Sequence, residues 1–198
     1  KKLNITITTN NASIAYQPWD EIQAFQCEAL KRQLAYVISK NAYYQQLIAD
    51  AKLNITAIQS LKDLQAFPIL TKAIVQEHIS DFTCITPTEI AEIDTTSGTL
   101  GSPLSISLSQ NDLDRLAYNE MLSFQSMDLS EKDVVQLTLT LDRQFMAGMA
   151  YYTGLRKIGA TIVRIGPGVP KMQWDCIFRY QTTVLVGVPS FILKMLHF

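Results

Sequence analysis

The chain is organised around Asp94-Thr95-Thr96-Ser97-Gly98-Thr99-Leu100-Gly101-Ser102-Pro103. Short runs of alternating apolar and polar residues flank this stretch at 89–93 and 104–108, and they predict a strand, a tight loop and a second strand. Serine, threonine and glycine make up most of the stretch. Glycines let a backbone approach a ligand closely, and successive amide groups in such a loop form a nest for anions. The composition therefore suits a polyphosphate.

Two other interpretations apply to the same ten residues. A hairpin loop made of turn-forming residues has this composition too, and composition alone favours neither reading. A Walker A motif ends in Gly-Lys-Ser or Gly-Lys-Thr, an ending that the stretch lacks. The P-loop NTPase motif is therefore excluded.

The order of residues from Thr96 to Pro103 resembles the Ser/Thr-Gly-Thr-Thr-Gly-Lys-Pro loop of the adenylate-forming superfamily, which includes acyl- and aryl-CoA ligases. In that superfamily the loop clasps the β- and γ-phosphates of ATP. Two residues depart from the pattern: Leu100 stands where Thr is usual, and Ser102 stands where Lys is usual, which removes a charge-assisted contact to phosphate. The resemblance implies ATP-phosphate binding by Thr95, Thr96, Ser97, Gly98, Thr99, Gly101 and Ser102.

Three further runs resemble the phenylacetate-CoA ligases within that superfamily. Residues 61–72 are similar to a Leu-X-Asp-Leu…Pro-X-X-Thr-Lys run that precedes the phosphate loop. Residues 159–163 are similar to a Gly-Ala-Thr-Val strand, and residues 188–191 to a Thr-Pro-Ser-Tyr turn. The similarity extends from about residue 30 to the end, and the order of the runs is its strongest part.

Composition narrows the class of protein. The 198 residues are 47% hydrophobic and 18% charged, which is ordinary for a globular chain able to bury a core. The formal net charge of -1 gives no electrostatic basis for binding nucleic acid. No apolar run reaches the length of a membrane span, and residues 1–6 show no secretory signal, so we expect a cytoplasmic protein.

Cysteine and histidine are too few and too dispersed to build a site. The three cysteines, Cys27, Cys84 and Cys176, are odd in number and widely spaced, which argues against a disulfide framework and a zinc knuckle. With only two histidines, a metal centre or a Ser-His-Asp triad has little support. We therefore assign no metal ligand and no catalytic residue.

The pattern of residues 1–90 predicts a mostly helical region. Residues 3–9 alternate as in a short strand. Pro18 fits the first turn of a long helix, which Asn41 interrupts before a second, shorter helix. A further short helix is predicted over 58–67, before Pro68, and Thr71 is predicted to cap a helix over 72–80.

Residues 91–198 predict a partial α/β unit. A capping box at 109–112 starts a helix that runs to about residue 127. Buried-strand runs at 134–139, 160–165 and 183–188 alternate with helical runs at 147–158, 171–180 and 190–198. Such a β-α-β-α-β order implies parallel strands with right-handed crossovers. The fold class is α/β: an N-terminal helical region followed by part of the parallel sheet of the adenylate-forming large N-terminal domain.

Ligands of open parallel sheets bind at the carboxyl ends of the strands, which here lead into the loops 140–146, 166–170 and 187–190. The middle loop contains Gly-X-Gly but lacks the third glycine of a dinucleotide fingerprint, so it is read as a turn. The resemblance places an acid-binding pocket at the first and third loops. Packing against the sheet explains Phe145 and Met146 equally well. The pocket residues implied are Phe145, Met146, Pro189 and Ser190.

The resemblance implies an ATP-dependent acid–thiol ligase that converts a small carboxylic acid and ATP into acyl-adenylate and pyrophosphate, then transfers the acyl group to CoA. The family's adenine, ribose and Mg²⁺ motifs are not found in these residues, so we expect an N-terminal fragment that is catalytically incomplete. We also expect a cut sheet to associate or dimerise through its exposed edge. A non-catalytic nucleotide-binding or scaffolding relative is the alternative, favoured by Ser102.

Overall fold

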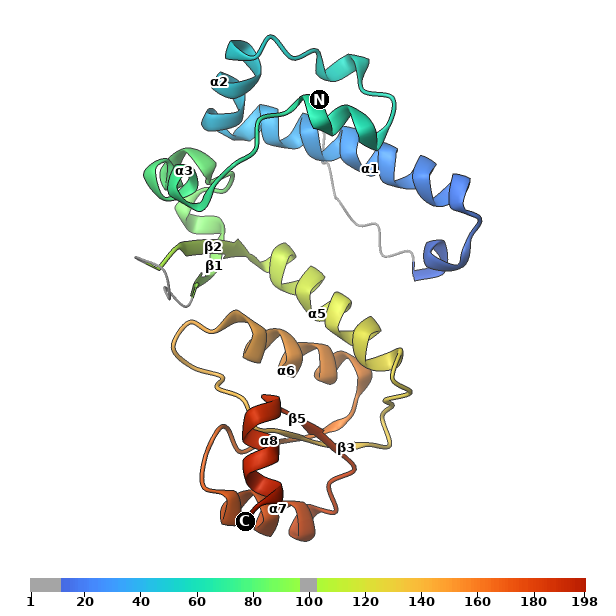
Figure 1. Cartoon of the computed structure of the whole chain (residues 1–198), viewed down its shortest axis with the longest axis vertical. Helices are drawn as coiled ribbons and strands as arrows, with labels where there is room; N and C mark the ends of the chain where they lie inside the picture. Colours follow the sequence, from blue (N-terminus) through green and yellow to red (C-terminus); the bar gives the residue numbers. More distant parts are fainter. Residues whose placement is uncertain (1–11, 97–102) are drawn as a thin grey trace. The chain divides into compact units, whose positions relative to one another are not determined.

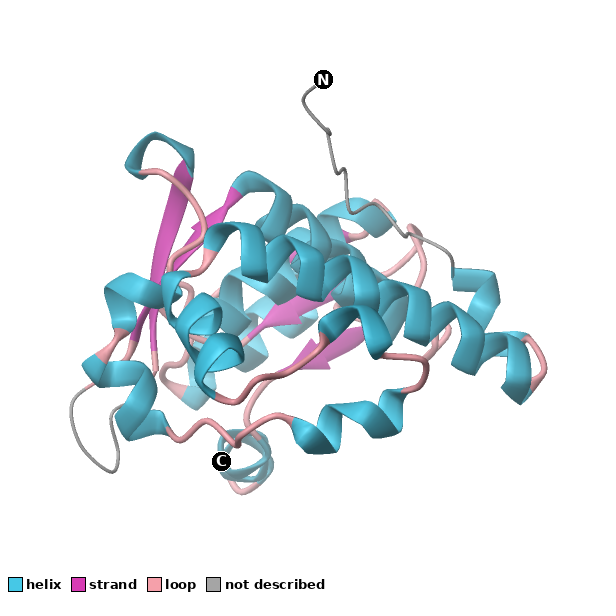
Figure 2. Ribbon diagram, turned by 90° about the horizontal axis from the view of Figure 1, so that it is seen from above, coloured by secondary structure: helices cyan, strands magenta, loops and turns pink. Residues whose placement is uncertain are grey.

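The computed structural model describes residues 12–96 and 103–198, and its chain divides into two compact units, residues 1–88 and 89–198. Helices make up most of the described chain, with a few short strands between them (Figure 2). No helix in the described ranges is both long enough and apolar enough to cross a bilayer. The predicted strand at 3–9 lies outside the described residues.

The first unit consists of the long helix α1 and several shorter helical elements (Figure 1). The predicted long helix is present, but Pro18 is its N-cap residue and lies just before the first turn in which it was expected. Asn41 ends α1 and begins α2, because its side chain accepts a hydrogen bond from Tyr44 N at 2.9 Å. The elements are η1 Ala12–Tyr16, α1 Trp19–Lys40, α2 Ala42–Asp50, η2 Ile55–Ala57, η3 Leu61–Ala66, α3 Lys72–Glu77, α4 Ile79–Phe82 and η4 Pro87–Glu89.

Two helix predictions in this unit are wrong in extent. The run predicted over 58–67 is a 3-10 helix limited to Leu61–Ala66, capped by a Ser60–Asp63 box. The helix predicted over 72–80 ends at Glu77, and a separate turn, Ile79–Phe82, follows His78. Thr71 does cap the first of these helices. These segments are too short for helix propensity to set their ends, so side-chain caps determine them.

The second unit carries two sheets. Strands β1 and β2 form an antiparallel pair, and β3, β4 and β5 form a parallel sheet in the order β4-β3-β5. The predicted alternation of strands and helices is confirmed, with strands shorter than the apolar runs. The elements are β1 Ile90–Thr95, β2 Ser105–Ser109, α5 Gln110–Gln125, β3 Val134–Leu137, α6 Met146–Ile158, β4 Thr161–Arg164, α7 Pro170–Tyr180, β5 Val184–Val186 and α8 Pro189–Leu196.

Local signals in the sequence account for the helix ends in this unit. Ser109 Oγ accepts a hydrogen bond from Asp112 N at 3.3 Å, and Asp112 Oδ2 accepts one from Ser109 N at 2.9 Å, which forms the predicted capping box. Gly159 ends α6 with φ 91°, a left-handed conformation that suits glycine. Pro170 and Pro189 each occupy the first helical position of α7 and α8.

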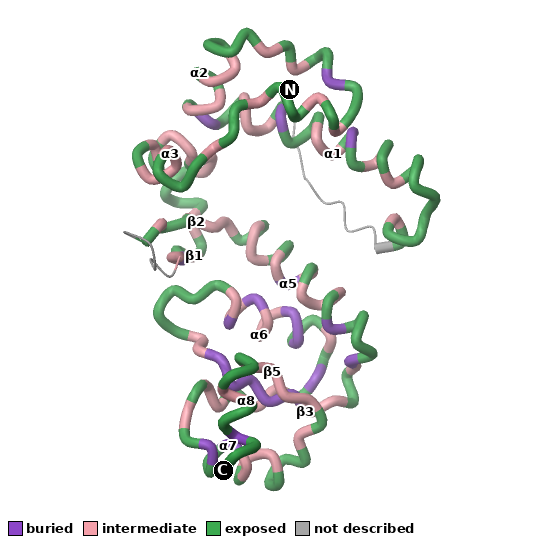
Figure 3. Tube along the Cα trace, in the orientation of Figure 1, coloured by how far each residue is buried: buried purple, intermediate pink, exposed green. Residues whose placement is uncertain are grey.

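The core of the second unit lies between the parallel sheet and α6. Val135, Leu137 and Leu155 are fully buried there, and burial is concentrated along β3 and α6 (Figure 3). Helices α7 and α8 cover the other face of the sheet (Figure 1). Gly154 lets α5 approach α6 closely, since a Cβ at this position would overlap the side chain of Glu120.

Candidate functional site

Only two of the seven predicted phosphate-binding residues can be placed. Thr95 is the last residue of β1, and Thr96 follows it. Ser97, Gly98, Thr99, Gly101 and Ser102 lie outside the described residues. The predicted strand–loop–strand arrangement around them is confirmed by the pairing of β1 with β2, in which Thr95 lies opposite Ser105.

The two threonines differ in what their polar groups do. Thr96 closes the hairpin: its amide donates to Leu104 O at 3.0 Å, and its hydroxyl accepts from Leu104 N at 3.0 Å. The Thr96 hydroxyl hydrogen has no acceptor in the part of the chain that the structure describes, so it can be donated to a ligand. Among the described residues, the Thr95 hydroxyl has no hydrogen-bond partner. Both side chains can therefore donate to an anionic oxygen, which is the chemistry that a phosphate requires.

A backbone hydrogen bond joins this hairpin to the loop that follows β3. Thr95 N donates to Gln144 O at 3.1 Å. Arg143 and Gln144 have φ angles of 59° and 58°, in the left-handed region that non-glycine residues seldom adopt. Such conformations cost about 1 kcal/mol or more each and persist where the surroundings impose them. The loop after β3 is thus held in one shape against the start of the predicted phosphate loop.

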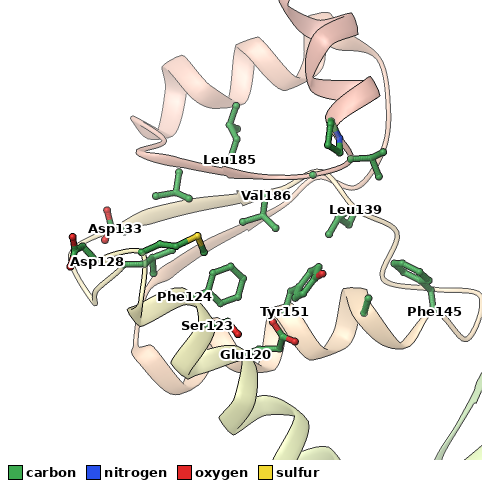
Figure 4. A pocket seen from close by; sticks show the side chains of 17 residues that line it. Glu120, Ser123, Phe124, Asp128, Asp133, Leu139, Phe145, Tyr151, Leu185 and Val186 are labelled. Atoms are coloured by element: carbon green, nitrogen blue, oxygen red, sulfur yellow. The ribbon is translucent and has the colours of Figure 1, made fainter. Parts of the chain in front are cut away.

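A cavity of about 770 Å³ opens between α5, α6 and the carboxyl end of β5 (Figure 4). Phe124 and Tyr151 form much of its apolar wall, with their rings edge to face at 5.9 Å. Glu120 lines it as well, and burial raises the pKa of that carboxyl group. The cavity can hold an apolar organic group with a polar end.

The four predicted pocket residues separate in the structure. Phe145 and Pro189 both line the 770 Å³ cavity, at the end of the loop after β3 and at the start of α8. Met146 instead lines a second cavity of about 380 Å³, together with Glu92 and Asp94 of β1. Ser190, in the first turn of α8, lines neither of these cavities. The sequence did not single out Glu120 or Tyr151, because they lie inside helices rather than in loops.

A third hollow, of about 560 Å³, lies at the carboxyl ends of β3 and β4 and brings Arg143 and Arg164 together. The Arg164 guanidinium lies over the Tyr152 ring, 5.3 Å from its centre. Gly166, whose carbonyl accepts a hydrogen bond from Gln173 Nε2 at 2.8 Å, also lines it. The Gly-X-Gly segment is thus held as a turn against α7, at the sheet edge where ligands of parallel sheets bind.

The described residues contain no metal-binding cluster and no disulfide. There, no group of three or more His, Cys, Asp or Glu side chains is placed to hold a metal ion. Cys27, Cys84 and Cys176 are free thiols; Cys27 is buried and the other two are half-buried. Cys27 Sγ donates to Gln59 O at 3.1 Å, which indicates a structural role.

Comparison with curated proteins identifies sequence relatives, although no protein-family profile matches the chain. The phenylacetate-coenzyme A ligase of Escherichia coli is 27% identical over 179 residues, which are 90% of this chain and 41% of that protein. The enzyme of the same name from Thermus thermophilus is 26% identical over 176 residues, which are 88% of this chain and 39% of that protein. The chain spans about 40% of the length of these curated relatives.

Solved structures show the same fold. A 2-hydroxyisobutyryl-CoA ligase in complex with 2-HIB-AMP and CoA superposes with a TM-score of 0.82 at 19% identity, over 91% of this chain and 40% of that one. An open conformation of the same ligase gives a TM-score of 0.81. The chain is therefore similar in sequence to the phenylacetate-CoA ligases and has the α/β fold of the corresponding part of an adenylate-forming CoA ligase.

Proposed function

We propose that the chain forms the part of an ATP-dependent acid–CoA ligase that holds the ATP phosphates and one wall of the acid pocket. The observation that carries this proposal is the similarity to phenylacetate-CoA ligases along 90% of the chain, in the order of its motifs. The TM-score of 0.82 to a ligase in complex with 2-HIB-AMP and CoA supports it. The proposed division into residues 1–90 and 91–198 assigns both sites to the second part.

The proposed reaction has two steps. The carboxylate of a small acid attacks the α-phosphorus of ATP, which releases pyrophosphate and forms an acyl-adenylate. The thiol of CoA then attacks the acyl carbon, and AMP leaves. Catalysis of this kind depends on positioning and on stabilising the charge of the phosphates. Mg²⁺ bound with ATP supplies further neutralisation, and no described residue is assigned to hold it.

The described residues include groups for binding both substrates of the first step, ATP and the acid. Thr95 and Thr96 donate hydroxyl hydrogen bonds to phosphate oxygens, and Ser97, Gly98, Thr99, Gly101 and Ser102 complete the proposed loop. Phe145 and Pro189 line the proposed acid pocket with Phe124 and Tyr151. The hydrogen bond from Thr95 N to Gln144 O couples the two ends, because it fixes the loop before Phe145 relative to the hairpin.

The test is acid-dependent exchange of pyrophosphate into ATP. The protein expressed from its complete reading frame is assayed with a panel of aryl and alkyl acids, with the 198-residue chain alongside. We expect exchange with one class of acid from the former and none from the latter. Exchange absent with every acid, while ATP still binds, would instead support a non-catalytic nucleotide-binding relative, the alternative suggested by Ser102 in place of lysine.

A Thr95→Val variant tests the phosphate assignment separately. A hydrogen bond to a charged group contributes about 1.5–3 kcal/mol, so the KM for ATP should rise roughly 10- to 100-fold while the KM for the acid stays unchanged. Thr153→Val is the matched control, because the Thr153 hydroxyl bonds only to carbonyls of its own helix, Met149 O and Ala150 O. Equal effects of the two variants would refute the assignment of Thr95.

A further inference from the structure

The cavity of about 380 Å³ beside β1 contains an acidic group whose polar atoms are unpaired. Asp94 is 3% exposed, and neither of its carboxylate oxygens has a hydrogen-bond partner among the described residues. Burying a carboxylate without partners costs several kcal/mol, so native structures seldom retain one without a purpose. Both oxygens are therefore available to a donor that enters the cavity.

Glu92 adds a second carboxylate on the same side of the strand. Side chains two residues apart on a strand share a face, and Glu92 and Asp94 both line this cavity. Burial raises the pKa of both carboxyl groups, and for Glu92 the charge of Asp94 adds to the effect. Ile93, between them, is 47% exposed on the opposite face. At these three positions the strand turns Glu92 and Asp94 inward and Ile93 outward, the reverse of what solubility alone favours.

Nearby cations of the described chain do not pair with these carboxylates. Arg156 and Lys157 line the same cavity from the end of α6, yet neither forms an ion pair with Glu92 or Asp94 in the described residues. Asp114, on α5, is exposed and accepts a hydrogen bond from Gln110 Nε2 at 3.1 Å. No described residue donates to the Asp94 carboxylate, so a ligand in the cavity can supply the donors.

The rest of the wall defines what kind of ligand fits. Leu113, Leu116, Met146 and Met149 surround the carboxylates with apolar and flexible side chains. In the described residues no group of three or more His, Cys, Asp or Glu side chains is placed to hold a metal ion, which leaves an organic cation as the ligand that these carboxylates suit. An ammonium group presents three donors, which suit two carboxylates on the same strand face, and the methionines and leucines suit a short hydrocarbon chain.

We propose that this cavity binds a primary alkylammonium ligand, with Asp94 and Glu92 as acceptors of the ammonium group and the side chains of α5 and α6 around its hydrocarbon chain. This site is separate from the proposed phosphate and acid sites, and it does not depend on the proposed ligase activity.

The probe is n-butylammonium chloride, titrated into the 198-residue chain near pH 8 at constant ionic strength and followed by calorimetry and by amide chemical shifts. We expect saturable binding by wild-type protein that weakens as the pH falls through the raised pKa values of the two carboxyl groups, because protonated carboxyl groups no longer attract a cation. Butan-1-ol, which has the same chain length without the charge, should not saturate. Saturation by butan-1-ol with equal affinity would overturn the proposal.

Three variants locate the site. Asp94→Asn keeps the shape of the side chain and should raise the Kd at least about tenfold, since it removes a charge-assisted bond. Glu92→Gln should raise the Kd roughly threefold, because it also removes a charged acceptor. This variant tests the site independently if Asp94→Asn does not fold. Asp175→Asn, on the exposed surface of α7, is the control and should leave the Kd unchanged.

A stability measurement separates a binding role from a structural one. Asp94→Asn should melt at the wild-type temperature or above it, because a buried amide replaces a carboxylate that has no partners among the described residues. Asp94 binding the ligand predicts lost affinity with retained stability. A Kd for Asp94→Asn within about twofold of wild type, or no saturable binding by wild-type protein, would overturn the proposal.

Discussion

A buried glutamine pair should couple β3 to α7. Gln136 and Gln173 are both fully buried, and Gln136 Nε2 donates to Gln173 Oε1 at 2.7 Å. Thr182 Oγ1 donates to Gln136 Oε1 at 3.2 Å, and Gln173 Nε2 donates to Gly166 O at 2.8 Å. This chain of hydrogen bonds runs from the middle of the sheet to the turn at the carboxyl end of β4. We predict that the two glutamines stabilise the unit only as a pair.

The expected magnitude follows from the groups left without partners. Gln173→Leu removes the side-chain bond from Gln136 Nε2, which keeps only its bond of 3.2 Å to the backbone carbonyl at position 173, and it leaves the Gly166 carbonyl without that donor. One lost hydrogen bond contributes about 1 kcal/mol and one unsatisfied group costs about 1–3 kcal/mol, so the loss should be about 2–4 kcal/mol. Gln136→Leu strands Gln173 Oε1 and the Thr182 hydroxyl, with a loss of about 2–3 kcal/mol. The double variant leaves two apolar side chains of similar volume in contact. It should cost about 1.5 kcal/mol less than the sum of the single variants.

Urea unfolding of the four proteins measures this coupling. Trp174 lies next to Gln173 on α7, and a Trp19→Phe background makes its fluorescence report on this unit alone, because the chain has two tryptophans. Lys171→Gln, which removes an exposed ion pair on the same helix, is the control and should cost under about 0.5 kcal/mol. Additivity of the single variants within about 0.5 kcal/mol would refute the idea of a coupled pair.

Three other changes have expected outcomes. Leu155→Ala, at a fully buried core position, should lower the free energy of unfolding by about 3–5 kcal/mol in the same urea assay, and a loss under about 1 kcal/mol would contradict the assigned core. Gly159 and Gln181 both end a helix at positive φ, which glycine adopts more easily than other residues. Gly159→Ala should therefore lower the free energy of unfolding by about 1 kcal/mol, and Gln181→Gly should raise it by about 0.5 kcal/mol. Melting temperatures of the two variants that shift in the same direction would refute this reasoning. Asp133 receives hydrogen bonds from Ser130 N and the Thr183 hydroxyl, which lower the pKa of its carboxyl group. The stability that the ionised Asp133 contributes is therefore complete above the unfolded-state pKa of about 3.9 and is lost as the pH falls through the lower pKa of the folded state. Urea midpoints of Asp133→Asn should lack this loss at acid pH, and the same acid dependence as in wild type would contradict the assignment.

The sequence was sufficient to predict helix ends where a particular residue type suits the backbone conformation at that end. The capping box at Ser109, the left-handed end of α6 at Gly159 and the prolines that begin α7 and α8 are all visible in the sequence and present in the structure. The parallel sheet followed from the alternation of apolar runs with helical periods. Its order β4-β3-β5, in which β4 and β5 are not neighbours, did not follow from that alternation.

The sequence could not reveal features that depend on partners distant in the chain. Gln136 sits inside an otherwise apolar strand, and only its contact with Gln173, 37 residues later, explains its burial. An aspartate near the end of a strand is expected to be exposed to solvent, but the packing of β1 leaves Asp94 only 3% exposed. The left-handed conformations of Arg143 and Gln144 are also hidden, because neither residue type favours them. Each is imposed by tertiary structure, against local preference.

Helix α6 shows why neighbours in the sequence need not share a site. Successive residues of an α-helix point about 100° apart. Ala147 and Tyr151, four residues apart, line the 770 Å³ cavity, whereas the positions that line the 380 Å³ cavity fall on a different arc, which begins at Met146. Gly154 lies between the two arcs, where α5 approaches most closely. Phe145 and Met146 were grouped because they are adjacent, but the helix that starts between them directs them into different cavities. A substitution at Met146 should therefore perturb the site at Asp94 and leave acid selectivity unchanged.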